Sequence, residues 1–326
     1  MDFSFPKNKS VKGGILKNFN GPRKFTLIDP SKPIHNLINI DNTEYVFYYL
    51  NSKGTNKGGN SIILNLYEVE NIDFENPNYG TPDLILKICK KPIRRLYEKI
   101  HQRFRIERVA IYRCNKYGFQ NIINMHHFGK CKIHKSIYLF YTMEYAEADL
   151  KKYVEDNSPL SDYSKIELCL SLANGLKELD SIGIFHRDLK PDNIFINGNI
   201  WKIGDLGLID HRKLNIDHKN EKIGPKGWMS PESMNKYLCE KKKLEFQYDH
   251  DIDHQSDIFQ LGKIFMYIFQ NNNPKGVFKQ GDLNINNNQV YQILRTMINY
   301  SKKRRYQDID QVIQLLKPIQ YKLLQA

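Results

Sequence analysis

The sequence predicts an α+β fold built from a small antiparallel β-sheet with one helix, followed by a larger α-helical part. Two observations predict it. Up to residue 146, short runs rich in β-branched and aromatic residues alternate with loops that contain Gly or Pro. Beyond residue 146, longer runs place apolar residues at helical spacing. A chain of 326 residues can bury a sizeable core in one large domain or two ordinary ones.

Five segments of the first part are predicted as strands because β-branched and aromatic residues dominate them. They are Tyr45–Asn51, Ile62–Val69, Leu84–Cys89, Phe128–Lys132 and Ile137–Tyr145. The loop 52–61 between the first two strands is rich in Gly, which predicts a hairpin. Residues 1–44 mix apolar islands with Lys, Asn, Gly and Pro, so we expect an N-terminal extension that packs loosely or is partly disordered.

Helical spacing of apolar residues predicts one helix over 93–117 in the first part and five helices after residue 146. The five are Leu150–Glu155, Asp162–Leu179, Ser256–Phe269, Val290–Tyr300 and Ile309–Leu323. The change of pattern divides the chain into three predicted segments, which are an extension at 1–44, a β-rich unit at 45–146 and a helical unit at 147–326.

Cysteine usage and hydropathy indicate a protein of a reducing compartment. The five Cys are scattered, odd in number and without a CxxC pair, which argues against a disulfide framework or a zinc site. The first 30 residues lack the continuous apolar stretch of a secretory signal, and apolar runs elsewhere are too short to span a bilayer. We therefore expect a cytoplasmic protein without a transmembrane segment.

The formal net charge of +13 favours acidic partners such as nucleotides, nucleic acid, anionic membranes or acidic proteins. A coding bias towards Lys, Asn and Ile with a solvated surface explains the same charge, and this interpretation is favoured. The predicted helix 93–117 carries eight Lys and Arg residues and could bind nucleic acid or an anionic surface. A solvated face is again favoured, because the helix lacks the interleaved aromatic residues on which bases stack.

The most informative stretch is His186–Asn193, which reads His-Arg-Asp-Leu-Lys-Pro-Asp-Asn and is followed by an Asp-Leu-Gly triplet that begins at Asp205. Phosphoryl transfer needs positioned groups, neutralised phosphate charge and an acceptor for the hydroxyl proton. Asp188 could accept or orient that proton, and Lys190 could meet a phosphate. Asn193 and Asp205 offer the hard oxygen ligands that suit Mg²⁺.

These motifs together resemble the signature of the eukaryotic-type protein kinases, and the resemblance extends over about residues 45–323. It implies a bilobal protein-kinase fold in which 45–146 form the N-lobe and 147–326 form the C-lobe. It also implies transfer of phosphate from ATP, with Mg²⁺, to hydroxyl groups of a protein substrate, with Asp188 as the catalytic base. Lys190 favours the serine/threonine branch of the family over the tyrosine branch.

The resemblance assigns the ATP phosphates to Lys87, which stands in the otherwise apolar strand 84–89 and needs an anionic partner. Glu107, on the basic helix, is the implied partner. A lysine that reaches solvent from the edge of a sheet is the alternative explanation for Lys87.

Further nucleotide contacts are implied by the resemblance. They comprise a Gly-rich loop, residues that enclose the base, the gatekeeper and hinge, and a carboxylate near the ribose. These are Gly58, Gly59, Ile63, Ile85, Met143, Glu144, Ala146, Asp149 and Phe195. By residue type alone, ordinary core packing explains the apolar members equally well.

Three positions depart from the family pattern. The Gly-rich loop keeps only its middle Gly, within Gly58-Gly59, so a weaker hold on nucleotide is expected. Leu206 replaces the Phe of the Asp-Phe-Gly triplet. Pro225 stands where serine/threonine kinases usually carry a Thr that hydrogen-bonds Asp188, and proline offers neither a hydroxyl nor an N–H. The choice between serine/threonine and tyrosine substrates therefore stays open.

The segment Leu208–Trp228 contains no Ser, Thr or Tyr, so it offers no hydroxyl for an activating phosphate. Arg187, the residue that normally binds such a phosphate in this family, is nevertheless present. One hypothesis is that a fixed carboxylate replaces the phosphate, and the candidates are Asp210, Asp217 and Glu221. The alternative is that Arg187 binds only backbone carbonyls.

Two further features resemble structural parts of the family. Ser230-Pro231-Glu232 resembles the Ala-Pro-Glu that closes the activation segment, and Glu232 is expected to pair with Arg304. Asp257 matches the helix Asp that supports the backbone of the catalytic loop.

Two other functions remain as alternatives. A pseudokinase or scaffold is supported by the irregular loop at 56–61 and opposed by the complete set of catalytic residue types. A small-molecule kinase is opposed by the Lys-Pro-x-x-Asn continuation after Asp188 and by the Pro-Glu end of the segment.

Overall fold

A computed structural model describes the greater part of the chain. The described residues are 11–16, 37–49, 61–72, 80–133, 136–156, 160–211, 217, 222–243, 245, 249–270, 278–285 and 287–325. The chain divides into two compact units. The first comprises Met1–Asn115 with Asn124–Tyr145, and the second Lys116–Ile123 with Ala146–Ala326.

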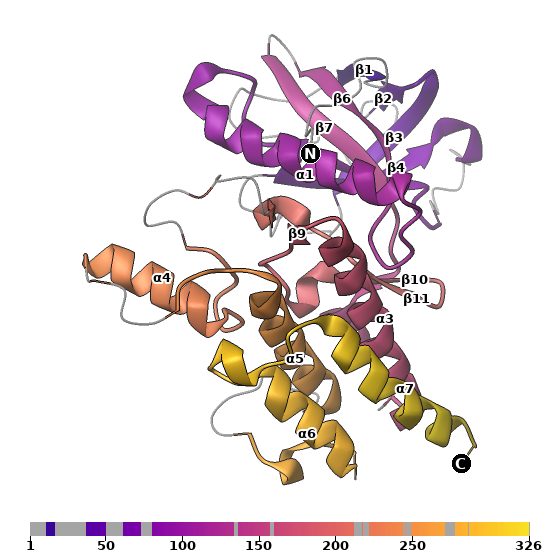
Figure 1. Cartoon of the computed structure of the whole chain (residues 1–326). Coiled ribbons are helices and arrows are strands. Elements are labelled where there is room, and N and C mark those ends of the chain that lie inside the picture. The colour runs from indigo at the N-terminus through magenta and orange to yellow at the C-terminus, as the bar shows by residue number, and fades with distance from the viewer. Residues whose placement is uncertain are drawn as a thin grey trace. The chain divides into compact units, whose positions relative to one another are not determined.

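The first unit is a seven-stranded sheet with one long helix, α1 (Glu98–Lys116). The strands are β1 (Val11–Leu16), β2 (Leu37–Ile40), β3 (Thr43–Tyr49), β4 (Ser61–Glu68), β5 (Leu84–Cys89), β6 (Met125–Ile133) and β7 (Ser136–Glu144). Their order is β1-β6-β7-β5-β4-β3-β2, and all pairs are antiparallel except β1 with β6 (Figure 1).

Two of these strands, β1 and β2, come from the region 1–44 that was expected to be a loosely packed extension. Strand β2 joins β3 through Asp41 and Asn42, whose φ angles are 52° and 69°. This left-handed pair is the turn that matches the twist of a two-residue hairpin, and Asn and Asp adopt it more readily than most residues. Asp41-Asn42 is therefore the local sequence signal of this hairpin.

Alternation along the strands separates the two faces of the sheet. One face carries a hydrophobic cluster that includes Leu64, Leu66, Leu86 and Ile88, all fully buried. The intervening residues of β4, β5 and β7 point to the opposite face. Register places Ile63 opposite Lys87 and Ile85 opposite Met143, so these four side chains share that second face.

Helix α1 is shorter than the predicted helix 93–117. A 3-10 turn (Arg95–Tyr97) precedes it, and Leu96 in this turn is 83% exposed. The buried residues of α1 include Phe104, Val109 and Ile111, whose spacing forms the expected apolar face.

The second unit is built on the long helix α3. Its helices are α2 (Leu150–Asp156), α3 (Asp162–Ser181), α4 (Pro231–Lys242), α5 (His254–Gln270), α6 (Asn288–Met297) and α7 (Ile309–Gln325). Ser161 caps α3 by accepting a hydrogen bond from the Ser164 N–H at 3.1 Å. Helices α5 and α7 pack on α3, and α4 lies to one side of them (Figure 1).

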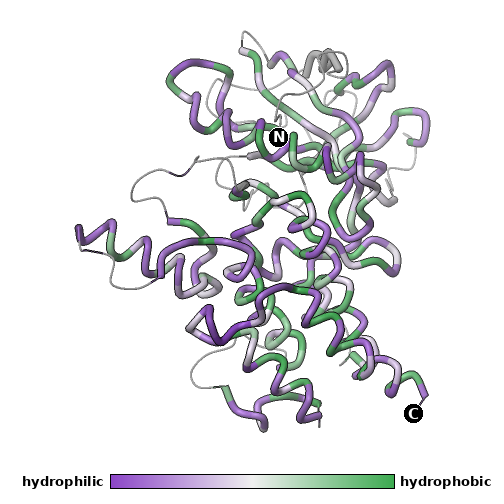
Figure 2. Tube along the Cα trace, viewed as in Figure 1, coloured by the Kyte–Doolittle hydropathy of each residue, from purple (hydrophilic) through white to green (hydrophobic). Residues whose placement is uncertain are grey.

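Hydropathy explains this packing. In Figure 2 apolar and polar stretches alternate along the helical coils, as expected for helices that bury one face. Helix α5 is the exception, because fourteen of its residues are buried and it therefore lies at the centre of its unit. No helix formed by the described residues is long and apolar enough to cross a membrane.

Short strands in the second unit position its loops. Strands β8 (Ala148–Asp149), β10 (Ile194–Asn197) and β11 (Ile200–Ile203) form one small sheet. Strands β9 (Ile184–Phe185) and β12 (Asp210–His211) form another. Because these strands are only two to four residues long, strand propensity in the sequence did not predict them.

Substitution of Gly175, in the middle of α3, tests how closely this helix packs. A Cβ added there would lie 2.9 Å from the backbone oxygen of Asn121, closer than real Cβ contacts allow. Gly175→Ala should therefore lower the free energy of unfolding by about 1–3 kcal/mol through overpacking, although alanine favours helices. Thermal or denaturant unfolding measures this.

The matched control is Gly281→Ala, because no atom lies within 4 Å of the Cβ position at Gly281. This variant should change the free energy of unfolding by less than about 0.5 kcal/mol. A Gly175→Ala protein as stable as the control would contradict the close approach of α3 to Asn121.

Candidate functional site

The catalytic-loop motif lies between β9 and β10, where the chain has no ladder of backbone hydrogen bonds. Asp257, at the start of α5, supplies the missing acceptors. Its carboxylate accepts hydrogen bonds from the N–H groups of His186 at 2.6 Å and Arg187 at 2.7 Å. Burial raises the pKa of Asp257 to about 7, against the effect of these two bonds. The expected support of the loop backbone by Asp257 is confirmed.

His186 ties the loop to the segment that precedes Asp205. Its Nε2 lies 3.0 Å from the carbonyl oxygen of Gly204. Burial lowers the pKa of His186 to about 4, so the imidazole is neutral at pH 7 and donates to that oxygen. The ring therefore links the two motifs.

Asp188 lies at the centre of a hydrogen-bonded group. Its Oδ2 accepts from Nδ2 of Asn193 at 2.9 Å and from Nζ of Lys190 at 3.3 Å. Burial raises the pKa of Asp188, Lys190 acts against this rise, and Asp205 adds to it. A carboxylate with a raised pKa is a better proton acceptor than an exposed one.

Pairing of β10 with β11 brings the two oxygen-ligand candidates together. Asn193 precedes β10 and Asp205 follows β11, and the Gly204 N–H donates to the Asn193 carbonyl at 2.9 Å. The side-chain NH₂ group of Asn193 donates hydrogen bonds to the carbonyl and the carboxylate of Asp188. The other end of the Asn193 amide is therefore its oxygen, which is the atom that can bind a metal ion. Asp205 is exposed, and its backbone has the left-handed conformation, with a φ angle of 55°.

This donor set fits Mg²⁺ held jointly with a substrate phosphate. The side-chain oxygens of Asn193 and Asp205 are hard ligands, and Mg²⁺ usually takes only one or two carboxylates from the protein. Within the described part of the chain, no group of three or more His, Cys, Asp or Glu could hold a metal alone.

The second predicted pair lies in the first unit. Nζ of Lys87 on β5 is 2.7 Å from Oε1 of Glu107 on α1, and both side chains are buried. The sheet order places β5 between β7 and β4, so Lys87 is not an edge-strand lysine and that alternative is wrong. Tyr141 on β7 donates its hydroxyl to the same Oε1 at 2.9 Å. Nothing in the sequence pointed to this third member.

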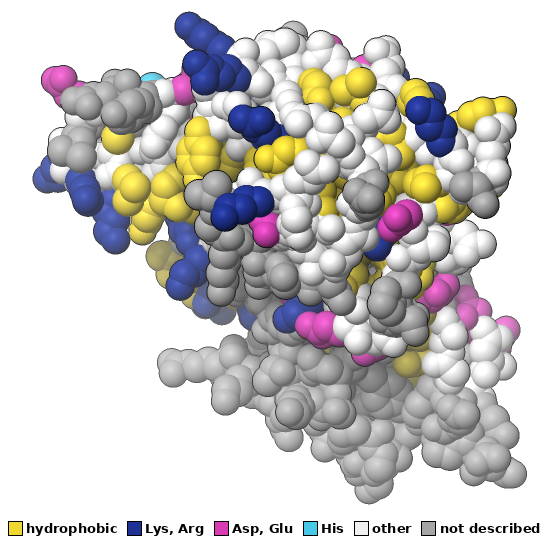
Figure 3. Space-filling view, turned by 90° about the horizontal axis from the view of Figure 1, so that it is seen from below, with side chains coloured by type: hydrophobic (Ala, Val, Ile, Leu, Met, Phe, Trp, Pro, Cys, Tyr) yellow, Lys and Arg dark blue, Asp and Glu magenta, His cyan; other side chains and the backbone are white. Residues whose placement is uncertain are grey.

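A buried arginine also fastens α1 to the sheet. Arg108 donates from Nη1 to the carbonyls of Gly129 at 3.2 Å and Phe140 at 3.4 Å. Burial lowers the pKa of Arg108 to about 10, which still leaves it charged at neutral pH. The basic helix is thus not uniformly a solvated face. On the face seen in Figure 3, Lys and Arg lie in separate groups, several of them next to Asp or Glu.

The remaining predicted nucleotide contacts lie in different parts of the structure. Ile63, Ile85 and Met143 share the sheet face of Lys87. Glu144 accepts a hydrogen bond from the Asn124 N–H at 2.7 Å at the end of β7, and Ala146 begins the longer segment of the second unit.

Within that unit, Asp149 of β8 pairs with Phe195 of β10 and caps α2 by accepting from the Lys152 N–H at 2.8 Å. Gly58 and Gly59 lie outside the described residues.

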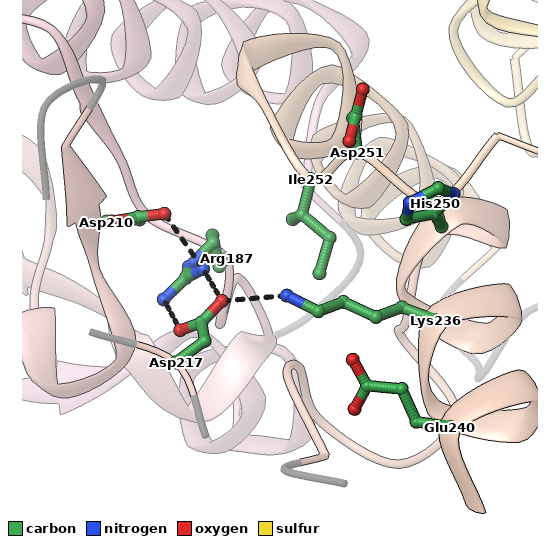
Figure 4. A pocket seen from close by; sticks show the side chains of 8 residues that line it. All are labelled: Arg187, Asp210, Asp217, Lys236, Glu240, His250, Asp251 and Ile252. Carbon is green, nitrogen blue, oxygen red and sulfur yellow. Dashed lines mark hydrogen bonds and ion pairs between the residues drawn. The ribbon is translucent and has the colours of Figure 1, made fainter. Parts of the chain in front are cut away.

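Arg187 is one of the most buried charged groups of the chain, with a side chain only 1% exposed. Its guanidinium donates to both carboxylate oxygens of Asp217, at 2.7 and 2.8 Å, and to Asp210 at 3.3 Å (Figure 4). It also donates to the carbonyls of Leu208 and Ile209. Backbone carbonyls are therefore only part of its environment, and the alternative of carbonyl binding alone is wrong.

Asp217 links Arg187 to helix α4. Nζ of Lys236 donates to Oδ2 of Asp217 at 3.1 Å, and these side chains line a pocket of about 400 Å³ (Figure 4). Burial alone would raise the pKa of Asp217, but the hydrogen bonds and charge of Arg187, with Lys236, hold it well below its ordinary range. Glu221, the third candidate, lies outside the described residues.

The structural ion pair of Glu232 differs from the prediction by one residue. Oε1 of Glu232 lies 2.8 Å from Nη2 of Arg305, and its Oε2 accepts from the Ser256 hydroxyl at 3.1 Å. Arg304 is exposed in the preceding 3-10 turn (Lys302–Arg304), so the expected pair with Arg304 is wrong. Adjacent arginines are equivalent by type, and only the turn decides which one points inward.

Replacement of each arginine separates the two assignments. Arg305→Met should lower the free energy of unfolding by about 3–5 kcal/mol, because Glu232 is left buried without its charged partner. Arg304→Met should change it by less than about 0.5 kcal/mol, as expected for a surface position. Equal effects of the two variants in denaturant unfolding would contradict the pairing.

Comparison with known proteins places these features in one family. A family model of the protein kinase domain matches residues 84–323. Serine/threonine-protein kinase KSP1 of Saccharomyces cerevisiae is 31% identical over 144 residues, which cover 43% of this chain and 13% of the relative. Mitogen-activated protein kinase 4 of Oryza sativa is 35% identical over 106 residues, 32% of this chain and 27% of the relative.

A relative described as inactive also matches. The inactive serine/threonine-protein kinase/endoribonuclease IRE1-like protein of Arabidopsis thaliana is 30% identical over 146 residues, which cover 43% of this chain and 24% of the relative. The chain thus spans less than a third of the length of each of these relatives. Because the family model covers more than half of its residues, the chain belongs to the protein kinase domain family.

Proposed function

We propose that the chain transfers the γ-phosphoryl group of ATP to hydroxyl groups of proteins, with serine and threonine favoured. The observation that carries this proposal is the hydrogen-bonded group of Asp188, Lys190 and Asn193, joined through Gly204 to Asp205. Lys190 and the serine/threonine kinases among the relatives support the substrate preference, whereas Pro225 opposes it.

Within this proposal Asp188 is the group that accepts or orients the proton of the attacking hydroxyl. Its carboxylate is held by Asn193 and Lys190, so it is presented in one orientation. Lys190 lies beside it, where its charge can neutralise a phosphate as the proton leaves the hydroxyl. Such pre-organisation avoids reorganising charged groups during the reaction.

The contacts proposed for Mg-ATP are those that the resemblance to the family implies. Lys87 would hold the phosphates, kept in place by Glu107, and Asn193 and Asp205 would hold Mg²⁺. The bound ion neutralises developing charge on the phosphate oxygens. Ile63, Ile85, Met143, Ala146 and Phe195 are proposed to contact the nucleotide base.

A pseudokinase is the second candidate, and one specific observation favours it, namely the likeness to a relative described as inactive. The buried charges argue against it. Keeping Lys87, Glu107 and Asp188 out of water costs stability that a scaffold would not need. Binding of ATP without transfer of its labelled γ-phosphate to any protein would favour this candidate.

Asp188→Asn is the first test of phosphoryl transfer. The amide cannot accept the hydroxyl proton, so turnover with Mg-ATP and a generic protein substrate should fall by about 1,000-fold. Asp310→Asn is the matched control, because its pair with Lys177 is half exposed and contributes little. Equal turnover of both variants would sink the assignment of Asp188.

We also propose that Asp217 takes the place of an activating phosphate on Arg187. The support is the bidentate contact together with the lack of Ser, Thr and Tyr between Leu208 and Trp228. A carboxylate carries less charge than a phosphate, and Lys236 adds a second cation that fixes it in position.

Phosphatase treatment of the purified protein should then leave its activity unchanged. Asp217→Asn removes the charge and should lower activity about tenfold by loosening the segment. Asp217→Glu, which keeps the charge, should retain more activity than Asp217→Asn. A large loss of activity after phosphatase treatment would contradict the fixed-charge proposal.

A further inference from the structure

A buried glutamine on α5 has no place in the proposed chemistry. The side chain of Gln260 is on the same helix as Asp257, one turn further along, and is 1% exposed. Its Oε1 accepts from the N–H of Leu189 at 3.1 Å, and its Nε2 donates to the carbonyl of Arg187 at 3.2 Å. The amide therefore bridges the two peptide groups that flank Asp188.

The orientation of this amide is not ambiguous. One partner is an N–H group, which can only donate, and the other is a carbonyl, which can only accept. Only one placement of the oxygen and nitrogen of Gln260 satisfies both. A side chain without both a donor and an acceptor at this distance would leave a buried backbone group without its bond.

The loop depends on side chains for all of its N–H bonds in this stretch. The N–H groups of His186 and Arg187 donate to Asp257, that of Asp188 donates to Nδ1 of His186, and that of Leu189 donates to Gln260. Arg187 has a φ of 64°, a conformation that costs energy for a residue with a side chain. Such a conformation persists only where the surroundings enforce it.

The end of the activation segment lies directly on the same bridge. Gly224 has a φ of 105°, and a Cβ there would lie 3.4 Å from both Nε2 of Gln260 and the carbonyl oxygen of Arg187. Pro225 follows and offers no hydroxyl to brace Asp188. Gln260 braces the loop instead, from the side of α5.

We infer that Gln260 is a positioning residue for Asp188, which it acts on by fixing the peptide groups on both sides. The inference rests on the proposed phosphoryl transfer. It assigns to α5 a pair of residues one turn apart that hold the loop. Asp257 binds the N–H groups of the first two residues of the motif, and Gln260 binds the carbonyl of the second and the N–H of the fourth.

Gln260→Met tests this role, because methionine has a similar length and volume but no hydrogen-bonding amide. The carboxylate of Asp188 should lose its fixed position, and kcat should fall by about 30-fold, since misplacement by an ångström can cost about 100-fold. KM for ATP should change less than about threefold, because phosphate contacts such as Lys87 are untouched.

Gln255→Met is the matched control on the same helix. Gln255 is also buried, and its Nε2 donates to the carbonyls of Lys302 and Tyr306, at 3.1 Å each, away from the loop. This variant loses a similar bridge and should lose comparable thermal stability while keeping its kcat. Equal falls of kcat in the two variants would show a merely structural role for Gln260 and overturn the inference.

A second variant tests the inference if Gln260→Met does not fold. Gln260→Glu keeps the length and the acceptor for the Leu189 N–H but loses the donor to Arg187. Its kcat should lie between those of the wild type and Gln260→Met. A kcat equal to that of the wild type would overturn the inference.

Amide hydrogen exchange separates this inference from the proposed function. In the folded protein, exchange within residues 186–190 should be about tenfold faster in Gln260→Met than in the wild type, and unchanged in Gln255→Met. If the wild type transfers no phosphate, the proposed function fails while exchange still reports on the bridge. Unchanged exchange in Gln260→Met would overturn the role of Gln260 whatever the activity.

Discussion

The carboxylate of Asp257 is the contact on which the candidate site depends. The loop that carries Asp188 lies between two short strands and belongs to no helix or sheet, so its N–H groups need acceptors from elsewhere. Asp257 binds two of them and Gln260 a third, both from the buried helix α5. The largely buried helix α5 thus anchors a polar loop, because a helix packed on most sides is rigid enough to hold a strained backbone in one conformation.

Buried ion pairs join segments that are distant in sequence. Lys87 meets Glu107, Arg187 meets Asp217, and Glu232 meets Arg305, each at 2.7 to 2.8 Å. Burial removes water from both charges of each pair, which costs free energy. The attraction between the charges offsets this cost only when further hydrogen bonds complete the geometry. Tyr141 completes the first pair, Lys236 the second and Ser256 the third. Such pairs favour a single arrangement of the two segments that they join, because any arrangement that separates the partners leaves a buried charge without its counter-charge.

Two features of the sequence appear contradictory. The loop of Asp188 carries Arg187, an arginine suited to bind phosphate, but the segment Leu208–Trp228 has no hydroxyl that could carry one. The structure reconciles them, because Asp217 and Asp210 supply negative charge at the guanidinium and α4 supplies Lys236 on the other side. A carboxylate carries its charge without modification, so this contact needs no phosphate.

Residue order alone determined the family, the division into a β-rich and a helical part, and the loop that carries Asp188, because these depend on short motifs and on local periodicity. It did not determine that β1 pairs with β6, that Arg305 rather than Arg304 meets Glu232, or that Tyr141 and Gln260 belong to the site. These depend on register, on the direction of a single turn and on contacts 34 to 71 residues apart. A tyrosine or a glutamine in an apolar run carries no signal of its partner, so only the tertiary structure decided which backbone and carboxylate groups they bind.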